Sequence, residues 1–149
     1  MKDLSNENII HIKNNGIEYI QFRRLLEYQD KIVHCYTIGR EKNYRRKEAG
    51  DNYLNLCKAI NIDYKKLVYS NQLHTDKVEC VEEVRDFEEE KINVDGLCTN
   101  TKGITISTIN ADCILLIFYD PVKNAIANVH SGWKGTLQRI SIKTVQKMM

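Results

Sequence analysis

The stretch Ile109-Asn-Ala-Asp-Cys-Ile-Leu-Leu-Ile-Phe-Tyr-Asp120 decides the fold, together with Asn128-Val-His-Ser-Gly-Trp-Lys-Gly-Thr136 shortly after it. Each segment holds an apolar run with a reactive side chain at one end: Cys113 opens the first run and His130 closes the second. The connection at 120–124 predicts a turn, because proline fixes φ and the Asp and Asn side chains bond back to the backbone. We therefore expect two neighbouring strands that bring a thiol and an imidazole to one edge.

A third reactive side chain, His74, lies upstream in Asn71-Gln-Leu-His-Thr-Asp-Lys-Val78. The working hypothesis is that His74, Cys113 and His130 form one site. Two histidines and one cysteine suit Zn²⁺ and leave a fourth position open, as in catalytic zinc sites. The same residues would also suit a thiol nucleophile with a histidine base. The separations of 39 and 17 residues match no local zinc motif, so spacing leaves both interpretations open.

Composition and charge exclude few functions. A chain of 149 residues has the usual size of one domain and is long enough to bury a core. Its 22 basic and 20 acidic residues give a net charge of +2, which favours no particular partner. Basic residues gather at 40–47, but Glu41 and Glu48 lie among or beside them. This pattern favours a solvated helix start over a nucleic-acid groove, and we expect no nucleic-acid partner.

The sequence also lacks signals for a membrane or an oxidising compartment. No apolar run approaches the roughly 18–20 residues that span a bilayer, and residues 1–7 lack a signal peptide's apolar core. We expect no membrane partner and a cytoplasmic location. Five cysteines without framework spacing indicate reduced thiols. Those outside the hypothetical site are interpreted as small buried hydrophobes: Cys35, Cys57, Cys80 and Cys98.

Local patterns predict a mixed α/β order of strands, helix, strands and helix. Asn15-Gly16 predicts a β-hairpin, because both positions tolerate positive φ. Helical spacing predicts helices at about 51–60 and from Thr136, as N-cap, to the end of the chain. The continuous apolar run 113–119 is typical of a strand buried on both faces. The expected strands are 9–12, 17–22, 31–37, 67–69, 78–84, 104–108, 113–119 and 125–129. We expect them to share one layered core with the helices.

Five short motifs stand in a distinctive order and spacing. They are Gln72-Leu-His-Thr-Asp-Lys-Val78, Asp95-Gly-Leu-Cys-Thr99, Ala111-Asp-Cys113, Asp120-Pro121 and His130-Ser-Gly-Trp-Lys-Gly-Thr136. In this order and spacing they resemble the YfiH/laccase-domain family, whose members are mostly described as purine nucleoside phosphorylases. The resemblance covers roughly residues 30–149.

The resemblance implies a YfiH-like fold, a mixed β-sheet layered with helices, which we expect to form a single domain over 1–149. It implies a zinc site at His74, Cys113 and His130, and the same three residues as catalytic. The implied activity is phosphorolysis of adenosine, inosine or methylthioadenosine, with adenosine deamination as a side activity. Purine nucleoside and inorganic phosphate are the implied partners. Older descriptions of the family include copper-dependent polyphenol oxidation, so copper is the less favoured metal.

The chain departs from the family pattern at the expected phosphate site. The family's tryptophan–arginine pair is Trp133-Lys134 here, which keeps the charge but loses the bidentate fork. The arginine that the family usually has at the position of Gly39 is one place later, at Arg40. Lys134 and Arg40 are the expected phosphate-binding residues. Family members continue well beyond the helix after His130, so we expect this chain to be truncated at its C-terminal end relative to them.

Three other functions fit the same residues. A metal-free cysteine hydrolase or deamidase would use Cys113 as its nucleophile. A copper oxidase would need several copper centres for four-electron oxygen reduction, and the sequence offers one Cys-His-His set. An incomplete domain would bind metal or a partner without turnover.

Overall fold

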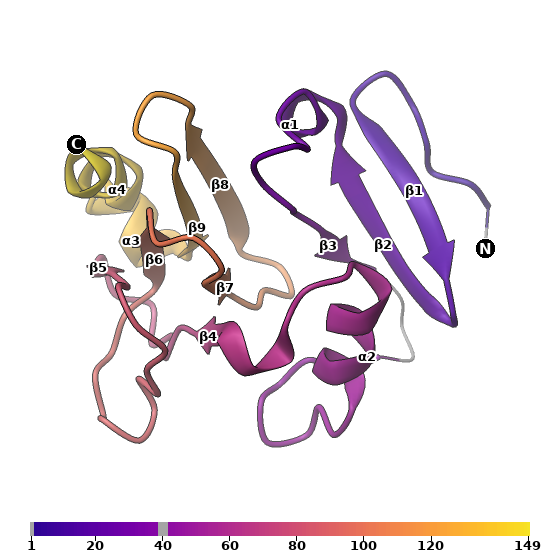
Figure 1. The fold of residues 1–149 in the computed structure, drawn as a ribbon. Coiled ribbons are helices and arrows are strands. Elements are labelled where there is room, and N and C mark those ends of the chain that lie inside the picture. Colours follow the sequence, from indigo (N-terminus) through magenta and orange to yellow (C-terminus); the bar gives the residue numbers. More distant parts are fainter. Residues whose placement is uncertain (1, 39–41) are drawn as a thin grey trace. The chain divides into compact units, whose positions relative to one another are not determined.

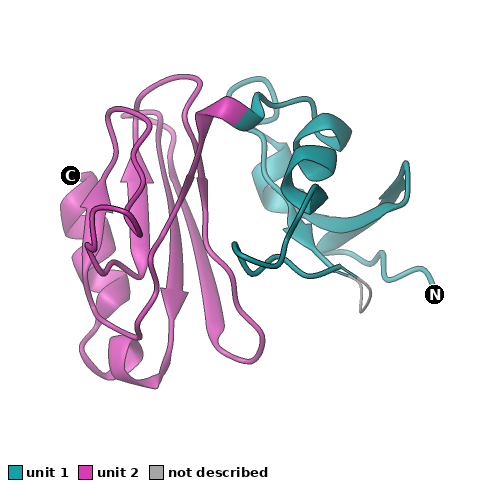
Figure 2. Cartoon of the chain, turned by 90° about the horizontal axis from the view of Figure 1, so that it is seen from below, with its two compact units in different colours: residues 1–64 teal, residues 65–149 magenta. Residues whose placement is uncertain are grey.

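The computed structural model describes residues 2–38 and 42–149, which belong to two units, residues 1–64 and 65–149 (Figure 2). Each unit has its own sheets and is described by itself. The single-domain interpretation stays a prediction. No helix among the described residues is long and apolar enough to cross a membrane.

The first unit is built on the predicted hairpin. Asn15 and Gly16 have φ values of 49° and 75°, and the strands on either side pair antiparallel in the register set by this turn. The third strand is shorter than the expected 31–37, and the second helix confirms the predicted helical segment. The elements are β1 Ile9–Asn14, β2 Ile17–Phe22, α1 Arg23–Leu26, β3 Tyr36–Thr37 and α2 Asn52–Ala59 (Figure 1).

The apolar face of the hairpin packs on α2. Ile17 and Tyr19 lie two residues apart in β2, so their side chains are on the same face of the strand. Both are buried in one cluster with Leu56 of α2. The basic segment before α2 does not begin the helix, which starts at Asn52. Arg40 lies outside the described residues.

The second unit contains a four-stranded sheet in the order β5-β6-β9-β8 and a separate parallel pair, β4 and β7. β5 runs parallel to β6, whereas β6, β9 and β8 alternate in direction. The short helix η1, Tyr64–Lys66, leads into this unit. The strands are β4 Leu67–Tyr69, β5 Val78–Cys80, β6 Gly96–Thr99, β7 Thr105–Ser107, β8 Ile114–Asp120 and β9 Ala125–Ser131.

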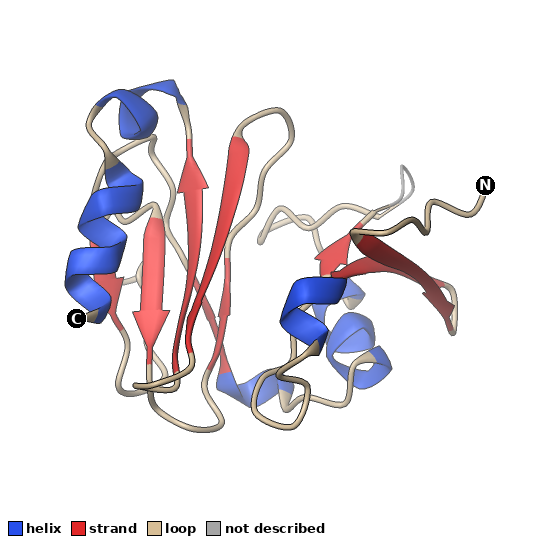
Figure 3. Ribbon diagram, turned by 90° about the horizontal axis from the view of Figure 1, so that it is seen from above, coloured by secondary structure: helices blue, strands red, loops and turns tan. Residues whose placement is uncertain are grey.

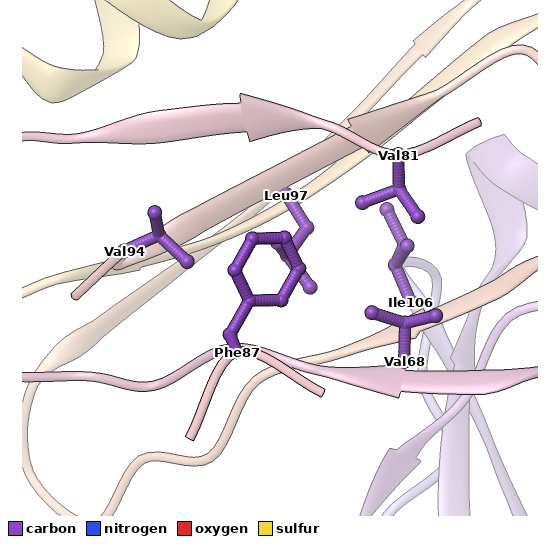
Figure 4. Packing of buried hydrophobic residues seen from close by; sticks show 6 residues of the cluster. All are labelled: Val68, Val81, Phe87, Val94, Leu97 and Ile106. Carbon is purple, nitrogen blue, oxygen red and sulfur yellow. The ribbon is translucent and has the colours of Figure 1, made fainter. Parts of the chain in front are cut away.

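Both faces of the four-stranded sheet are covered. The helix α4, Ile140–Met148, packs across β5, β6 and β9 on one face (Figure 3). On the other face, Leu97 packs with the β4–β7 pair and with Phe87 from the loop after β5. Figure 4 shows the ring of Phe87 in the middle of this cluster, with Val68 and Val81 nearby. Leu97 and Cys98 belong to opposite cores, as the period of two in a strand requires.

Two sequence predictions differ from the structure here. β8 is not buried on both faces: each of its residues is half-buried or exposed, because β8 lies at the end of the sheet order rather than inside it. The final helix is interrupted as well. A five-residue helix, α3 Trp133–Leu137, is capped by Gly132, and the chain then turns at Arg139, whose φ is 60°. Thr136 therefore lies inside α3 and is not an N-cap.

Candidate metal centre

The structure brings the three hypothetical site residues together. Cys113 immediately precedes β8, and His130 lies near the end of β9. The antiparallel register pairs Ile114 with Ser131, which places the thiol beside the imidazole, as the strand–turn–strand pattern predicts. His74 reaches the same place from the loop between β4 and β5.

The donor atoms have the spacing of a metal site. The ligand atoms of His74, Cys113 and His130 all lie within 4.8 Å of one another. Cys113 Sγ is 3.8 Å from His74 Nε2. Tetrahedral zinc with Zn–S of about 2.3 Å and Zn–N of about 2.1 Å would hold such a pair roughly 3.6 Å apart. Cys113 is a free thiol, so its sulfur is available, and the set of two imidazoles and one thiolate fits Zn²⁺.

Asp95, which the sequence presented only as part of a family motif, is a further residue of the site. It is fully buried, and its Oδ1 lies 2.8 Å from His130 Nδ1. Its backbone carbonyl also accepts the N–H of His130 at 2.7 Å. An acidic residue directly before a buried strand was the available signal, because a buried carboxylate requires donors.

The same carboxylate holds the loop that carries His74. It accepts backbone N–H groups from Leu73 at 3.4 Å, from His74 at 3.1 Å and from Thr75 at 2.6 Å. The hydroxyl of Thr75 donates to it at 2.6 Å. Burial acts to raise the pKa of the Asp95 carboxyl, but the hydrogen bonds from His130 and Thr75 outweigh burial and keep this pKa below its ordinary value. Asp95 is therefore a charged acceptor shared by two of the three segments.

Gln72 connects the His74 loop to the loop before Cys113. Its side chain accepts the N–H of Ile109 at 2.8 Å and donates to the carbonyl of Ile109 at 2.6 Å. The side chain of Asn110 donates to the carbonyl of Cys113 at 2.9 Å. In the sequence, Gln72 stood out only as the first residue of a family motif. Two-point pairing of a side-chain amide with one backbone residue fixes both loops.

Gly132 leaves room for the imidazole of His74. A Cβ atom at Gly132 would lie 2.6 Å from Cδ2 of His74 and 3.5 Å from Cε1 of His130. The two rings meet edge to face, with centroids 4.8 Å apart. Gly132 has a φ of −66°, which any residue adopts, so the need for glycine here is one of space.

Of the two expected phosphate-binding residues, the structure describes Lys134 only. Lys134 is exposed on α3, and its Nζ lies 5.6 Å from the centre of the Trp133 ring. Trp133 is itself 69% exposed, and Leu73 and Ile114, which neighbour two of the candidate ligands in sequence, are also exposed. An exposed cation four residues after His130 suits an anionic substrate. Arg40 lies outside the described residues.

The fold is α/β and the site contains three side chains that could hold a metal ion, and comparison with known proteins shows the family. The model of the multi-copper polyphenol oxidoreductase laccase family matches residues 20–149. The chain belongs to this family. The structure is similar to the crystal structure of Bacillus licheniformis hypothetical protein YfiH, with a TM-score of 0.63 and 19% identity over 96% of this chain and 56% of that one. The predicted mixed α/β, YfiH-like fold is confirmed.

Two relatives whose names state an enzymatic activity are similar to this chain. A purine nucleoside phosphorylase of Clostridium acetobutylicum is 34% identical over 137 residues, which are 89% of this chain and 56% of that protein. Adenosine deaminase RL5, from an unknown prokaryotic organism, is 32% identical over 104 residues, 66% of this chain and 40% of that protein. The chain thus spans about half the length, or less, of these relatives.

Proposed function

We propose that this chain carries the metal centre of a zinc-dependent purine nucleoside phosphorylase. The observation that carries the proposal is the group of donor atoms from His74, Cys113 and His130, all within 4.8 Å of one another. The similarity to a purine nucleoside phosphorylase supports the substrate class, a purine nucleoside and inorganic phosphate.

In phosphorolysis, an oxygen of phosphate bonds to C1′ of the ribose while the bond from C1′ to the base breaks, and the electron pair leaves with the base. In our proposal His74, Cys113 and His130 hold the metal. A zinc ion held there would supply a Lewis acid with one coordination position open. Lys134 and Arg40 receive the phosphate anion, which each binds through its positive charge.

The geometry favours a metal over a thiol nucleophile. A thiol mechanism needs one histidine that takes the proton of the thiol and is itself oriented by a third group. Here the thiol of Cys113 contacts His74, whereas the carboxylate of Asp95 orients His130. The two requirements fall on different histidines. A metal needs both imidazoles at once, which is the arrangement present.

The proposal extends to the details that the resemblance implied. Adenosine, inosine or methylthioadenosine is the nucleoside, and adenosine deamination is a side activity, in keeping with the similarity to an adenosine deaminase. Zinc is proposed over copper, since the described residues provide one such donor group and oxygen reduction by four electrons ordinarily uses several copper centres. A cytoplasmic location is part of the same proposal.

The test is an assay of the purified chain with adenosine, with and without phosphate, in which every product is identified and bound metal is measured. We expect adenine and ribose phosphate only when phosphate is present, inosine in either condition, and close to one zinc per chain. His130→Ala, which removes a metal ligand, is the matched inactive control. Absence of phosphate-dependent base release by the zinc-loaded chain would refute the proposal. Full activity after complete removal of metal would support the thiol alternative.

A further inference from the structure

We propose that Asp95 is the positioning residue of this centre: it sets the tautomer of His130 and holds the His74 loop in its ligand-presenting conformation. The inference uses the metal centre of the proposed function, but its first consequence is visible without metal or substrate. It concerns which nitrogen of His130 carries hydrogen and what keeps His74 in place.

Asp95 contacts His130 through two hydrogen bonds. The backbone carbonyl of Asp95 accepts the backbone N–H of His130 at 2.7 Å, and the side-chain Oδ1 lies 2.8 Å from His130 Nδ1. An ionised carboxylate is an acceptor only, so Nδ1 must carry the hydrogen. Nε2 then keeps its lone pair, which is the form of imidazole that binds a metal. Because His130 is only 3% exposed, water does not compete effectively for its Nδ1.

Asp95 also stabilises an unfavourable backbone conformation at His74. The φ of His74 is 59°, in the left-handed region that residues other than glycine rarely adopt. Three successive N–H groups, from Leu73 to Thr75, point at the Asp95 carboxylate. Successive N–H groups that converge in this way form an anion-binding concavity, and here the anion is a side chain of the same unit. The negative charge therefore offsets the cost of the conformation.

An amide at position 95 cannot serve both functions. An asparagine has one oxygen and one NH₂ group, so one side of it must present hydrogens to groups that are themselves donors. If the NH₂ group faces Thr75, it opposes the backbone N–H of that residue. If it faces His130, it opposes the backbone N–H of His74, which donates to the same oxygen at 3.1 Å, and the ring can accept at Nδ1 only by moving its hydrogen to Nε2, which removes the lone pair needed for metal. We expect this second arrangement, because it opposes one longer backbone contact, whereas the first opposes the N–H groups of Leu73 and Thr75. The His130 ring can also exchange its hydrogen, and a backbone amide cannot.

The experiment compares wild type, Asp95→Asn and Thr99→Val, each as the whole chain. Thr99 lies in β6, is buried, and donates its hydroxyl to the carbonyl of Val81 at 2.6 Å. Thr99→Val thus removes a buried hydrogen bond in the same unit and leaves the donor atoms of His74, Cys113 and His130 untouched. Histidine tautomers are read from ¹⁵N shifts of the metal-free proteins, zinc affinity from competition with a chromophoric chelator, and stability from thermal unfolding.

We expect wild-type His130 to carry hydrogen on Nδ1, and Asp95→Asn to move it to Nε2 and to weaken zinc binding about 10–100-fold. Thr99→Val should unfold at a lower temperature with the wild-type tautomer and affinity. An unchanged tautomer and affinity in Asp95→Asn would overturn the inference, as would equal effects in Thr99→Val. If Asp95→Asn does not fold, wild type alone decides, because hydrogen on Nε2 of its His130 contradicts the inference. Wild type that shows the Nδ1 tautomer but no phosphorolysis would refute the proposed function and leave the role of Asp95 standing.

Discussion

Gly132→Ala should damage the metal centre with little effect on folding. The added Cβ would lie 2.6 Å from Cδ2 of His74, and ordinary carbon–carbon contacts are about 3.5–4.0 Å. The ring of His74 must therefore retreat by roughly 1 Å. The backbone at Gly132 needs no change, because its φ is −66°. The substitution thus displaces a ligand and does not strain the chain.

The expected loss of zinc affinity follows from the small displacement of a ligand atom that a metal site tolerates. Functional constellations need their groups within about 0.5 Å of the productive position, so a displacement near 1 Å moves Nε2 of His74 out of range. We expect zinc affinity to fall about 10–100-fold, which is the loss typical of disturbed ligand orientation. That range corresponds to about 1.4–2.8 kcal/mol. The free energy of unfolding of the metal-free protein should change by less than about 1 kcal/mol, since alanine lowers the entropy of the unfolded chain by a comparable amount.

The assay measures zinc affinity and thermal unfolding in the same preparations, with Gly103→Ala as the control. Gly103 lies in the same unit, and a Cβ there meets nothing within 4 Å, but its φ is 90°. Alanine at Gly103 should therefore lower stability and leave zinc affinity unchanged, the reverse of the pattern at Gly132. Wild-type zinc affinity in Gly132→Ala would refute the proposed arrangement of the ligands.

Three further predictions concern single residues. His74→Ala and His130→Ala should each weaken zinc binding by orders of magnitude in elemental analysis and competition assays, and wild-type affinity in either would remove that histidine from the ligand set. Lys134→Ala should raise the KM for phosphate far more than the KM for nucleoside in steady-state kinetics, whereas equal changes would contradict its role. In metal-free protein at pH 8, alkylation followed by mass spectrometry should label Cys113 well before Cys35, because burial raises the pKa of Cys35 to about 12 and keeps it protonated, and zinc should protect Cys113.

The sequence predicted those parts of the fold that local patterns determine. The Asn15-Gly16 turn set the hairpin, and the turn at 120–124 set the pairing of β8 with β9. The end of the chain was less predictable. The single helix predicted from Thr136 to the end of the chain is broken at Arg139, whose φ is 60°. Within α4, Ile140 is fully buried and Val145 is 45% exposed, because five steps of about 100° turn their side chains about 140° apart.

Long-range contacts account for what the sequence analysis missed. Phe87 lies among acidic residues, a setting typical of a solvated loop, yet its ring fills a core between β4, β6 and β7. Asp95 resembled a turn residue, and its role depends on donors 20 to 35 positions away in the chain. In each case the residue type was compatible with the environment, but the partner was set by tertiary structure. The reactive residues were predictable because their chemistry is distinctive, and the residues that hold them were not.

The candidate centre depends on three separate connections between three segments. The β8–β9 register connects Cys113 to His130, the carboxylate of Asp95 connects His130 to the His74 loop, and Gln72 connects that loop to the segment before Cys113. The first connection is part of a sheet, so it is as stable as the unit itself. The other two rest on single side chains and hold a loop with positive φ. A metal that binds all three ligands would add a fourth connection, and at 1,000 times its Kd it would stabilise the folded state by about 4 kcal/mol. Most of that gain would fall on the loop, because His130 lies in β9 and Cys113 directly precedes β8, whereas no strand contains His74. His74 is therefore the candidate ligand whose position Asp95 and a bound metal would jointly determine.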